Sequence, residues 1–464
     1  EDELLECEQF QISVAFITMG GITPLLQTLK ELEKREIPGK ILTTNYLNFS
    51  EPRALEKLNS LSNITLKMYD VEAATEGFHT KGYIFKKEEI YRIIIGSSNI
   101  TSAALTCNRE WNTKLISTEQ GGMAKEIVAE FHELWNSQHA LSYGEFFENY
   151  KERYEIIKHQ REIAKQEKIP SIEKYKLQPN SMQVKFIANL RKIVESGLTA
   201  TPDKREDNDL SKNVYELFNH QIAYEIRLQQ AMEEDLLCPF HYFGISDISL
   251  LTDDQVKARN ISEEDFGKLT SDERVRHIIE QAGYYGYSGD RVKGLIFCSR
   301  NKECEELSAK FNELGYRTVA LSGANSDQER ESAFERLAMN AENATDEIQP
   351  LDYIFSVDIL NEGVDIVEVN QVIMLRPTQS PIVFIQQLGR GLRKAENKEY
   401  VVILDFIGNY NNNFMIPVAL SGDRTYNPDT IRKYVTSGNN TIPGTSTIHL
   451  DEISKEKIFS SIDK

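Results

Sequence analysis

The stretch Phe78-His79-Thr80-Lys81-Gly82-Tyr83-Ile84-Phe85 sets two polar side chains into a pattern that is typical of a β-strand. Alternate residues of a strand point to the same face of a sheet, so His79 and Lys81 are predicted to share one face. The apolar run Ile93-Ile94-Ile95 is followed by Gly96-Ser97-Ser98-Asn99, which supplies small polar groups at a strand end. In chemical terms these residues are an imidazole nucleophile, an ammonium group that binds phosphate, and a hydroxyl and amide pair.

Around this stretch, predicted strands and helices alternate from residue 10 to residue 150, which indicates a layered α/β domain. Helices are predicted for Thr23–Arg35, from Glu51-Pro52 onward, and for Gly122–Ser137, because their apolar residues recur at helical spacing. The predicted strands are Phe10–Ile17, Lys40–Thr44, Ile64–Tyr69, the strand with His79, Tyr91–Ile95 and Trp111–Ile116.

This segment resembles the phospholipase D superfamily of phosphodiesterases, specifically its single-motif nuclease branch, across residues 10–140. The resemblance is carried by His79-x-Lys81, by Gly96-Ser97-Ser98-Asn99, and by Glu110 within Asn108-Arg109-Glu110-Trp111-Asn112. One position departs from the family pattern: Lys86-Lys87 stands where the family has an Asp a few residues after the Lys.

The resemblance implies a role for each residue. His79 would attack phosphorus and form a phospho-histidine, and a second His79 from another copy of the domain would protonate the leaving oxygen. Lys81 and Asn99 would hold the non-bridging oxygens with support from Ser97, and Glu110 would orient an imidazole. This chemistry requires no metal. Since each chain carries one motif set, the domain is expected to form a homodimer with the site at its interface.

Residues 140–176 are rich in Glu, Lys, Arg and Tyr, and Glu145–Lys168 has helical spacing. We interpret this segment as a solvated connecting helix, with a nucleic-acid contact along its Lys and Arg face as the alternative.

A new unit begins near Lys176, where Pro179-Asn180-Ser181 precedes a predicted helix. Leu198-Thr199-Ala200-Thr201-Pro202 resembles the third motif of superfamily-two helicases, and Gln183 resembles their adenine-reading glutamine. Such proteins carry a phosphate-binding loop and an acidic magnesium motif between these two points, and neither is in this sequence. We interpret the junction at Gly197–Leu198 as a deletion or as a place where residues are missing from the chain, and we favour the second interpretation.

From Lys293 onward, strands separated by helices indicate a parallel, doubly wound sheet. This part resembles the second motor lobe of a superfamily-two helicase, through Gly294–Arg300, Asn361-Glu-Gly-Val-Asp365 and Gln386-x-x-Gly389-Arg390-x-x-Arg393. The resemblance implies that Arg390 and Arg393 reach the γ-phosphate of ATP held by a first lobe, as an arginine finger does. Gly363 and Asp365 would lie in the turn that couples nucleotide state to nucleic-acid grip, and Gln386 belongs to the arginine motif.

The length, net charge and composition of the chain limit the classes of protein to which it can belong. The chain has 464 residues and a net charge of −19, so a general nucleic-acid coat protein is disfavoured, while a local basic channel is compatible with these totals. No run of about 18 apolar residues occurs, so no membrane span is expected. Glu1-Asp2-Glu3-Leu4-Leu5 has no signal-peptide pattern, and the five cysteines form no Cys-x-x-Cys pair, so we expect no structural zinc and a reducing cytoplasm.

The sequence therefore predicts an α/β protein, with a phospholipase D-like α/β/α layered domain followed by RecA-like helicase lobes of which the first is largely absent. The predicted segments are a nuclease domain at 1–140, a helical linker at 141–176, a first-lobe remnant and interlobe segment at 177–290, a second lobe at 291–421, and a C-terminal region of unread role at 422–464.

The predicted function is an ATP-dependent and Mg²⁺-dependent motor on duplex or single-stranded DNA, fused to a DNA-cutting phosphodiesterase and used in bacterial restriction or anti-phage defence. One alternative is a nucleic-acid-stimulated ATPase sensor or remodeller whose nuclease-like domain mainly dimerises. Another alternative is a phospholipid or RNA phosphodiesterase.

Overall fold

The computed structural model divides into two compact units, Glu1–Lys176 and Leu177–Lys464, each of which is described by itself. The residues that the structure describes are 1–74, 78, 80–106, 110–166, 228–233, 236–248, 261–345, 348–357, 366–378, 380–421, 425–437 and 446–463.

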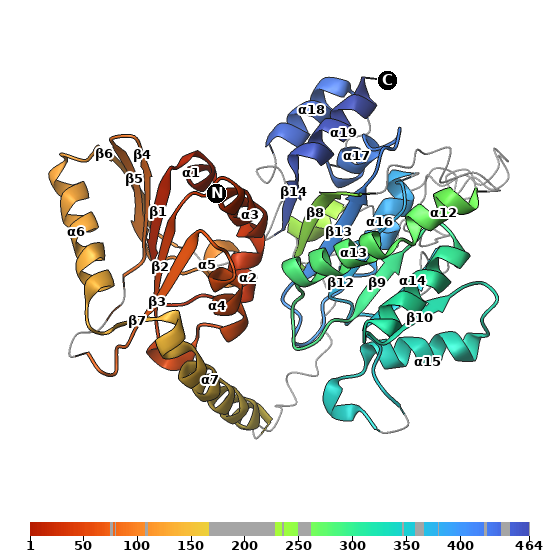
Figure 1. Cartoon of the computed structure of the whole chain (residues 1–464), viewed down its shortest axis with the longest axis horizontal. Coiled ribbons are helices and arrows are strands. Elements are labelled where there is room, and N and C mark those ends of the chain that lie inside the picture. Colours follow the sequence, from red (N-terminus) through yellow and green to blue (C-terminus); the bar gives the residue numbers. More distant parts are fainter. Residues whose placement is uncertain are drawn as a thin grey trace, which may run out of the picture. The chain divides into compact units, whose positions relative to one another are not determined.

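The first unit is built on a seven-stranded sheet in the order β6-β5-β4-β1-β2-β3-β7 (Figure 1). Strands β1, β2 and β3 run parallel, and β4 pairs antiparallel with β1, which begins an antiparallel wing through β5 and β6. The strands are β1 Gln9–Ser13, β2 Gly39–Thr44, β3 Ile64–Tyr69, β4 Gly82–Lys87, β5 Ile90–Gly96, β6 Asn112–Thr118 and β7 Ala140–Ser142.

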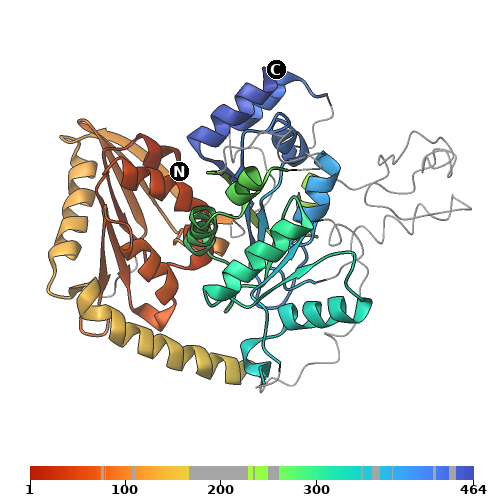
Figure 2. The same cartoon turned by 45° about the vertical axis from the view of Figure 1, so that its right-hand side comes forward.

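Helices cover both faces of this sheet, as Figures 1 and 2 show, with α6 on one side and α2, α3 and α4 on the other. Helix α6 packs Ala124, Phe131 and Trp135 against buried strand residues that include Ile84 and Ile93. The helices of this unit are α1 Asp2–Glu6, α2 Met19–Ile22, α3 Leu26–Lys34, α4 Pro52–Asn59, α5 Ser102–Thr106, α6 Gly122–Asn136 and α7 Tyr143–Gln166, with 3₁₀ turns at Thr23–Leu25 and Tyr46–Asn48.

The second unit is built on a seven-stranded sheet in the order β10-β11-β9-β12-β13-β8-β14, in which every pairing is parallel. The strands are β8 Phe240–Ser246, β9 Gly294–Phe297, β10 Thr318–Leu321, β11 Tyr353–Ser356, β12 Gln371–Met374, β13 Val401–Ile407 and β14 Thr447–Leu450. Strands β8 and β14 come from outside the 291–421 range predicted for the second lobe, yet they extend the same sheet.

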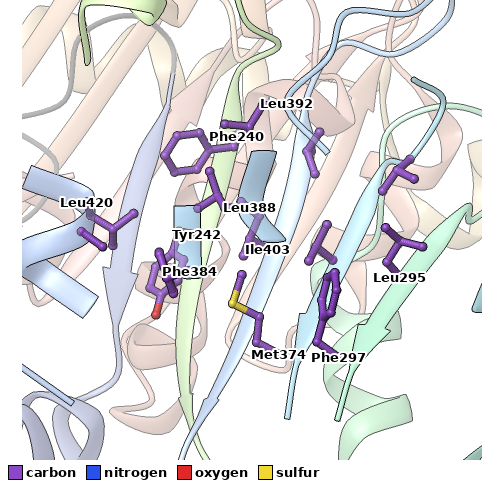
Figure 3. Close-up of a cluster of buried hydrophobic side chains, with 14 of the residues drawn as sticks. Phe240, Tyr242, Leu295, Phe297, Met374, Phe384, Leu388, Leu392, Ile403 and Leu420 are labelled. Atoms are coloured by element: carbon purple, nitrogen blue, oxygen red, sulfur yellow. The ribbon is translucent and has the colours of Figure 1, made fainter. Parts of the chain in front are cut away.

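Both faces of this sheet are buried, so its strands are almost continuously apolar. One face forms a core in which Tyr242 and Ile403 lie beside Phe384 of α16, as Figure 3 shows. On the other face, Tyr285 of α13 stacks on Phe243 with ring centroids 4.1 Å apart. The helices are α10 Leu228–Glu233, α12 Glu263–Leu269, α13 Asp272–Tyr285, α14 Asn301–Glu313, α15 Asp327–Ala338, α16 Pro381–Gly389, α17 Met415–Ser421, α18 Pro428–Ser437 and α19 Glu452–Ile462, with a 3₁₀ turn at Ala341–Asn343.

The predicted α/β fold, with a layered first domain and a parallel sheet in the second part of the chain, is confirmed. In the part of the chain that the structure describes, each helix is too short or too polar to span a bilayer. The prediction that His79 and Lys81 alternate on one strand is wrong for Lys81, because β4 begins at Gly82. The pairing of β4 with β1 ends at Ser13, opposite Gly82, so Lys81 lies just before the paired region. His79 lies outside the described residues.

Candidate functional site

The polar loop Ser97–Asn99 follows β5. Gly96, the last residue of β5, allows the chain to pass close to the start of the next strand, β6. A Cβ atom at Gly96 would lie 2.2 Å from the backbone oxygen of Trp111, closer than any real contact. The backbone nitrogen of Ser97 donates to that same oxygen at 3.1 Å. The glycine of the predicted motif is therefore required by packing, and it fixes the loop against the start of β6.

Ser97 connects this loop to the predicted carboxylate. Its hydroxyl donates a hydrogen bond to Oε2 of Glu110 and accepts one from the backbone nitrogen of Trp111 at 3.1 Å. Asn112 adds a second connection, since its Nδ2 donates to Oγ of Ser98 at 2.8 Å. The loop and the segment that carries Glu110 thus form one hydrogen-bonded unit.

Asn99 faces the end of β1. Its Oδ1 accepts hydrogen bonds from the backbone nitrogens of Ala15 and Phe16, at 3.0 and 3.2 Å. An Asn side chain has one acceptor oxygen and one NH₂ donor group. With the oxygen bound to the backbone, Nδ2 is the group of Asn99 that is suited to hold a phosphate oxygen.

Lys81 is a buried cation beside this unit. Only 7% of the residue is exposed, and its backbone oxygen accepts from the nitrogen of Gly96 at 3.2 Å. Burial lowers the pKa of the Lys81 ammonium, and the negative charge of Glu110 opposes that shift. A poorly hydrated ammonium attracts an anion more strongly than an exposed one does, because the local dielectric is lower.

Tyr83 is a neighbour of the site that the sequence did not single out. Its hydroxyl donates to the backbone oxygen of Ser98 at 2.9 Å. Burial, with the charge of Glu110 as the second cause, raises the pKa of Tyr83. The available signal was its position two residues after Lys81, which places it at the loop end of β4.

The structure therefore brings Lys81, Ser97 and Glu110 together, with Asn99 on the same loop as Ser97. We call Lys81, Ser97, Asn99 and Glu110 the phosphodiester site. The roles of these residues, and of His79, remain predictions.

In the second unit, a buried ion-pair network joins the carboxyl ends of several parallel strands. Arg274 of α13 is fully buried and forms ion pairs with Asp247 at 2.9 Å and with Glu303 at 3.0 Å. It also donates to the backbone oxygen of Leu375 at 3.3 Å, and Glu303 accepts from the nitrogen of Ser299 at 2.9 Å. The network thus joins the loops that follow β8, β9 and β12.

Sequence reasoning missed this network, although a signal was present. Arg274 lies next to Val275 in the apolar stripe of α13, which continues with Ile278 and Ala282. A charged residue in such a stripe needs a buried partner.

Part of the predicted arginine motif, Gln386–Arg393, is packed in the interior of the second unit. Gln386 lies in α16 and is buried, and Leu392 belongs to the core. A Cβ atom at Gly391 would lie 2.8 Å from Cγ1 of Val401, so this glycine lets the segment lie against β13. Arg390 and Arg393 flank the anchored Gly391-Leu392 pair, and Arg393 is exposed.

Gln183, Gly363 and Asp365 lie outside the described residues. The residues that are present do not make up a complete site for ATP and Mg²⁺, because the sequence has no phosphate-binding loop. Within the described ranges, no group of three or more His, Cys, Asp or Glu side chains is placed to hold a metal ion.

Comparison with known proteins identifies the two units. Residues 5–135 match the family model described as "Cardiolipin synthase, PLD-like domain", and residues 273–395 match the "Helicase conserved C-terminal domain". The chain therefore carries a phospholipase D-like domain followed by the C-terminal RecA-like lobe of a helicase, which confirms the resemblance to the phospholipase D superfamily and to a second helicase lobe.

Two curated proteins are similar over part of the chain. The "Putative ATP-dependent helicase IRC3" of Saccharomyces cerevisiae is 22% identical over 218 residues, which are 47% of this chain and 30% of that protein. The "51.5 kDa protein" of a Lactococcus phage is 23% identical over 218 residues, 46% of this chain and 43% of that protein. The chain thus spans less than half the length of these relatives.

Among solved structures, the fragment of "a putative HsdR subunit of a type I restriction enzyme from Vibrio vulnificus YJ016" is 23% identical. It aligns with 45% of this chain and 38% of its own, with a TM-score of 0.34.

Proposed function

We propose that the phospholipase D-like domain is a phosphodiesterase that cuts DNA, and that the helicase lobe is one half of an ATP-dependent motor that brings DNA to it. The observation that carries the first part is the hydrogen-bonded unit of Ser97 and Glu110 beside the buried ammonium of Lys81. In this arrangement the ammonium of Lys81 supplies positive charge for a phosphate group, and Ser97 fixes the position of the Glu110 carboxylate beside it.

The proposed reaction has two steps. The imidazole of His79 forms a bond to phosphorus, and the phosphorus–oxygen bond to the leaving strand breaks. The leaving oxygen takes a proton from a second imidazole. Water then attacks the phospho-histidine, gives its proton to that second imidazole, and releases the cut strand and His79. Lys81 and Nδ2 of Asn99 stabilise the charge on the non-bridging oxygens, and Glu110 orients an imidazole.

The second imidazole is proposed to come from a partner chain, because each chain has one motif set. A homodimer with two-fold symmetry brings two identical residues face to face at its axis. The pairing of a motor lobe with a nuclease-type domain further suggests a role in restriction or anti-phage defence.

The test uses the purified full chain with an end-labelled DNA strand in EDTA and without ATP. We expect cleavage by the wild type and none by His79→Ala. Excess His79→Ala chain added to the wild type should suppress cleavage beyond simple dilution, because mixed dimers carry one imidazole. Unchanged cleavage by His79→Ala would refute the assignment and favour a domain that only dimerises. Cleavage of phospholipid in preference to DNA would mean that the substrate of this domain is phospholipid and not DNA.

A further inference from the structure

Trp111 is an exposed aromatic side chain directly beside the phosphodiester site. It is 89% exposed, although tryptophan is usually among the more buried residue types. The other tryptophan of the chain, Trp135 of α6, is 6% exposed and stacks on Phe131 of the same helix in the core. Packing within the domain therefore does not explain Trp111.

The backbone of Trp111 is hydrogen-bonded to the Ser97–Asn99 loop. Its nitrogen donates to Oγ of Ser97, and its oxygen accepts from the nitrogen of Ser97. On either side, Glu110 bonds Ser97 and Asn112 bonds Ser98. Hydrogen bonds thus hold the backbone that carries the indole, one residue from the carboxylate of Glu110.

If Lys81 and Nδ2 of Asn99 hold a phosphate of the substrate, the chemical group next to that phosphate lies near the segment that carries Trp111. For a nucleic acid that group is a sugar and base, and an unpaired base offers a face for stacking. A base within a duplex is already stacked on both sides, so it gains nothing without leaving the helix.

We propose that Trp111 is a base-stacking residue, which makes the phosphodiester site select unpaired strands of nucleic acid. This inference rests on the proposed phosphodiesterase function and adds its substrate class. It also assigns an order of events, in which a strand-separating step supplies the substrate.

The first experiment measures binding by the full chain, without ATP, in the His79→Ala background so that the strand stays intact. Trp135→Phe leaves Trp111 as the single tryptophan, so its emission reports on this site even if another part of the chain also binds DNA. We expect a 12-residue oligothymidylate to quench this emission saturably. An abasic strand of equal length and the matching duplex should not quench it. If Trp135→Phe does not fold, the emission difference between His79→Ala chains with and without Trp111→Phe gives the same measurement.

The second experiment measures affinity. Trp111→Ala should weaken binding of oligothymidylate by about 5- to 100-fold, the range found for removal of one stacking aromatic. Binding of the abasic strand should not change, and Trp111→Phe should retain most of the affinity. Ile116→Ala and Met123→Ala are the controls, because both residues are exposed and apolar in the same domain.

Equal quenching by the abasic strand or the duplex would overturn the proposal. It would also be overturned if Trp111→Ala turned a dimer into a monomer while the affinity for oligothymidylate stayed the same, since the indole would then be a contact between chains. Both measurements are independent of cleavage, so a failure of the phosphodiesterase function is distinguishable from a failure of stacking.

Discussion

The Oδ1 atom of Asn99 accepts a hydrogen bond from the backbone nitrogen of Ala15 at 3.0 Å, although the two residues are 84 positions apart. A second bond from Phe16 makes the oxygen a structural link between the Ser97–Asn99 loop and the end of β1. The NH₂ group on the same side chain is the proposed donor to substrate. One residue thus combines a structural role with a proposed chemical role, and substitutions can separate the two.

Asn99→Asp should abolish most cleavage with little loss of stability. The aspartate keeps the acceptor oxygen for Ala15 and Phe16, but it replaces the NH₂ donor with negative charge. Loss of one such donor reduces turnover by about 100- to 1000-fold in comparable sites. Asn99→Leu should also lower the free energy of unfolding by about 2 kcal/mol, because two backbone N–H groups lose their acceptor.

Cleavage rates and urea unfolding of the first unit, followed by tryptophan emission, provide the check. If Asn99→Asp cleaved at the wild-type rate, the NH₂ group would have no part in holding phosphate.

Arg274→Met should destabilise the second unit by about 3–5 kcal/mol, because it leaves the carboxylates of Asp247 and Glu303 buried without their cation. The matched control is Arg276→Met on the same helix. Arg276 is exposed, so its replacement should change stability by less than about 0.5 kcal/mol. Adding Glu303→Gln to Arg274→Met should restore part of the loss.

Urea unfolding, read by hydrogen exchange on peptides from β8 and β13, measures these differences in the second unit. Equal effects of the Arg274 and Arg276 variants would mean that the network contributes nothing to stability.

Asp405→Asn should change how the stability of the second unit depends on pH. Asp405 is buried and accepts a hydrogen bond from the hydroxyl of Tyr242 at 2.6 Å. Burial raises the pKa of Asp405 to about 7, and the bond from Tyr242 opposes the shift. Between the unfolded value near 4 and pH 7, the native state binds the extra proton, so this group makes stability fall as pH rises, by up to about 1.4 kcal/mol per pH unit.

Asparagine removes that contribution and still accepts from Tyr242. Relative to the wild type, the variant should therefore become more stable with rising pH from 4 to 7. The urea midpoint of the second unit across this range is the measurement, and parallel curves for the two proteins would contradict the prediction.

His241→Gln should change the pH dependence in the opposite sense. His241 is buried, and its Nδ1 lies 2.9 Å from Oγ1 of Thr447. Burial, with the charge of His449 as the second cause, lowers the pKa of His241 to about 3. The unfolded chain therefore binds the extra proton below about pH 6.5, and this group makes stability fall as pH falls.

Glutamine does not titrate and can still bond Thr447, so the variant should resist acid better than the wild type between pH 6 and pH 4. The exposed His159→Gln serves as the control and should follow the wild-type curve. If the stability of His241→Gln decreased between pH 6 and pH 4 as steeply as that of the wild type, this imidazole would not be buried in its neutral form.

Much of the fold could be predicted because its elements carry local patterns. The expected helix Gly122–Ser137 is α6, Gly122–Asn136, and the expected strand near Gly294 is β9. The hydrogen bond between Ser97 and Glu110 joins two residues that the sequence had placed in one spaced motif, while the roles of these residues stay predictions. Contacts between distant segments were not readable, because no local pattern encodes them. The bond from Ala15 to Asn99 and the burial of Arg274 between three strand ends belong to this class.

The pairing of β14 with β8 constrains the order in which the second unit can be completed during synthesis. His241 and Thr447 are hydrogen-bonded neighbours across 206 residues of sequence. At about 5–20 residues per second, a ribosome needs on the order of 10 to 40 seconds to make the intervening chain. Both strand neighbours of β8, β13 and β14, are made after it. Until β13 emerges, the apolar β8 has two unpaired edges, and one edge stays unpaired until β14 emerges, which makes the nascent chain vulnerable to aggregation if translation stalls in this interval.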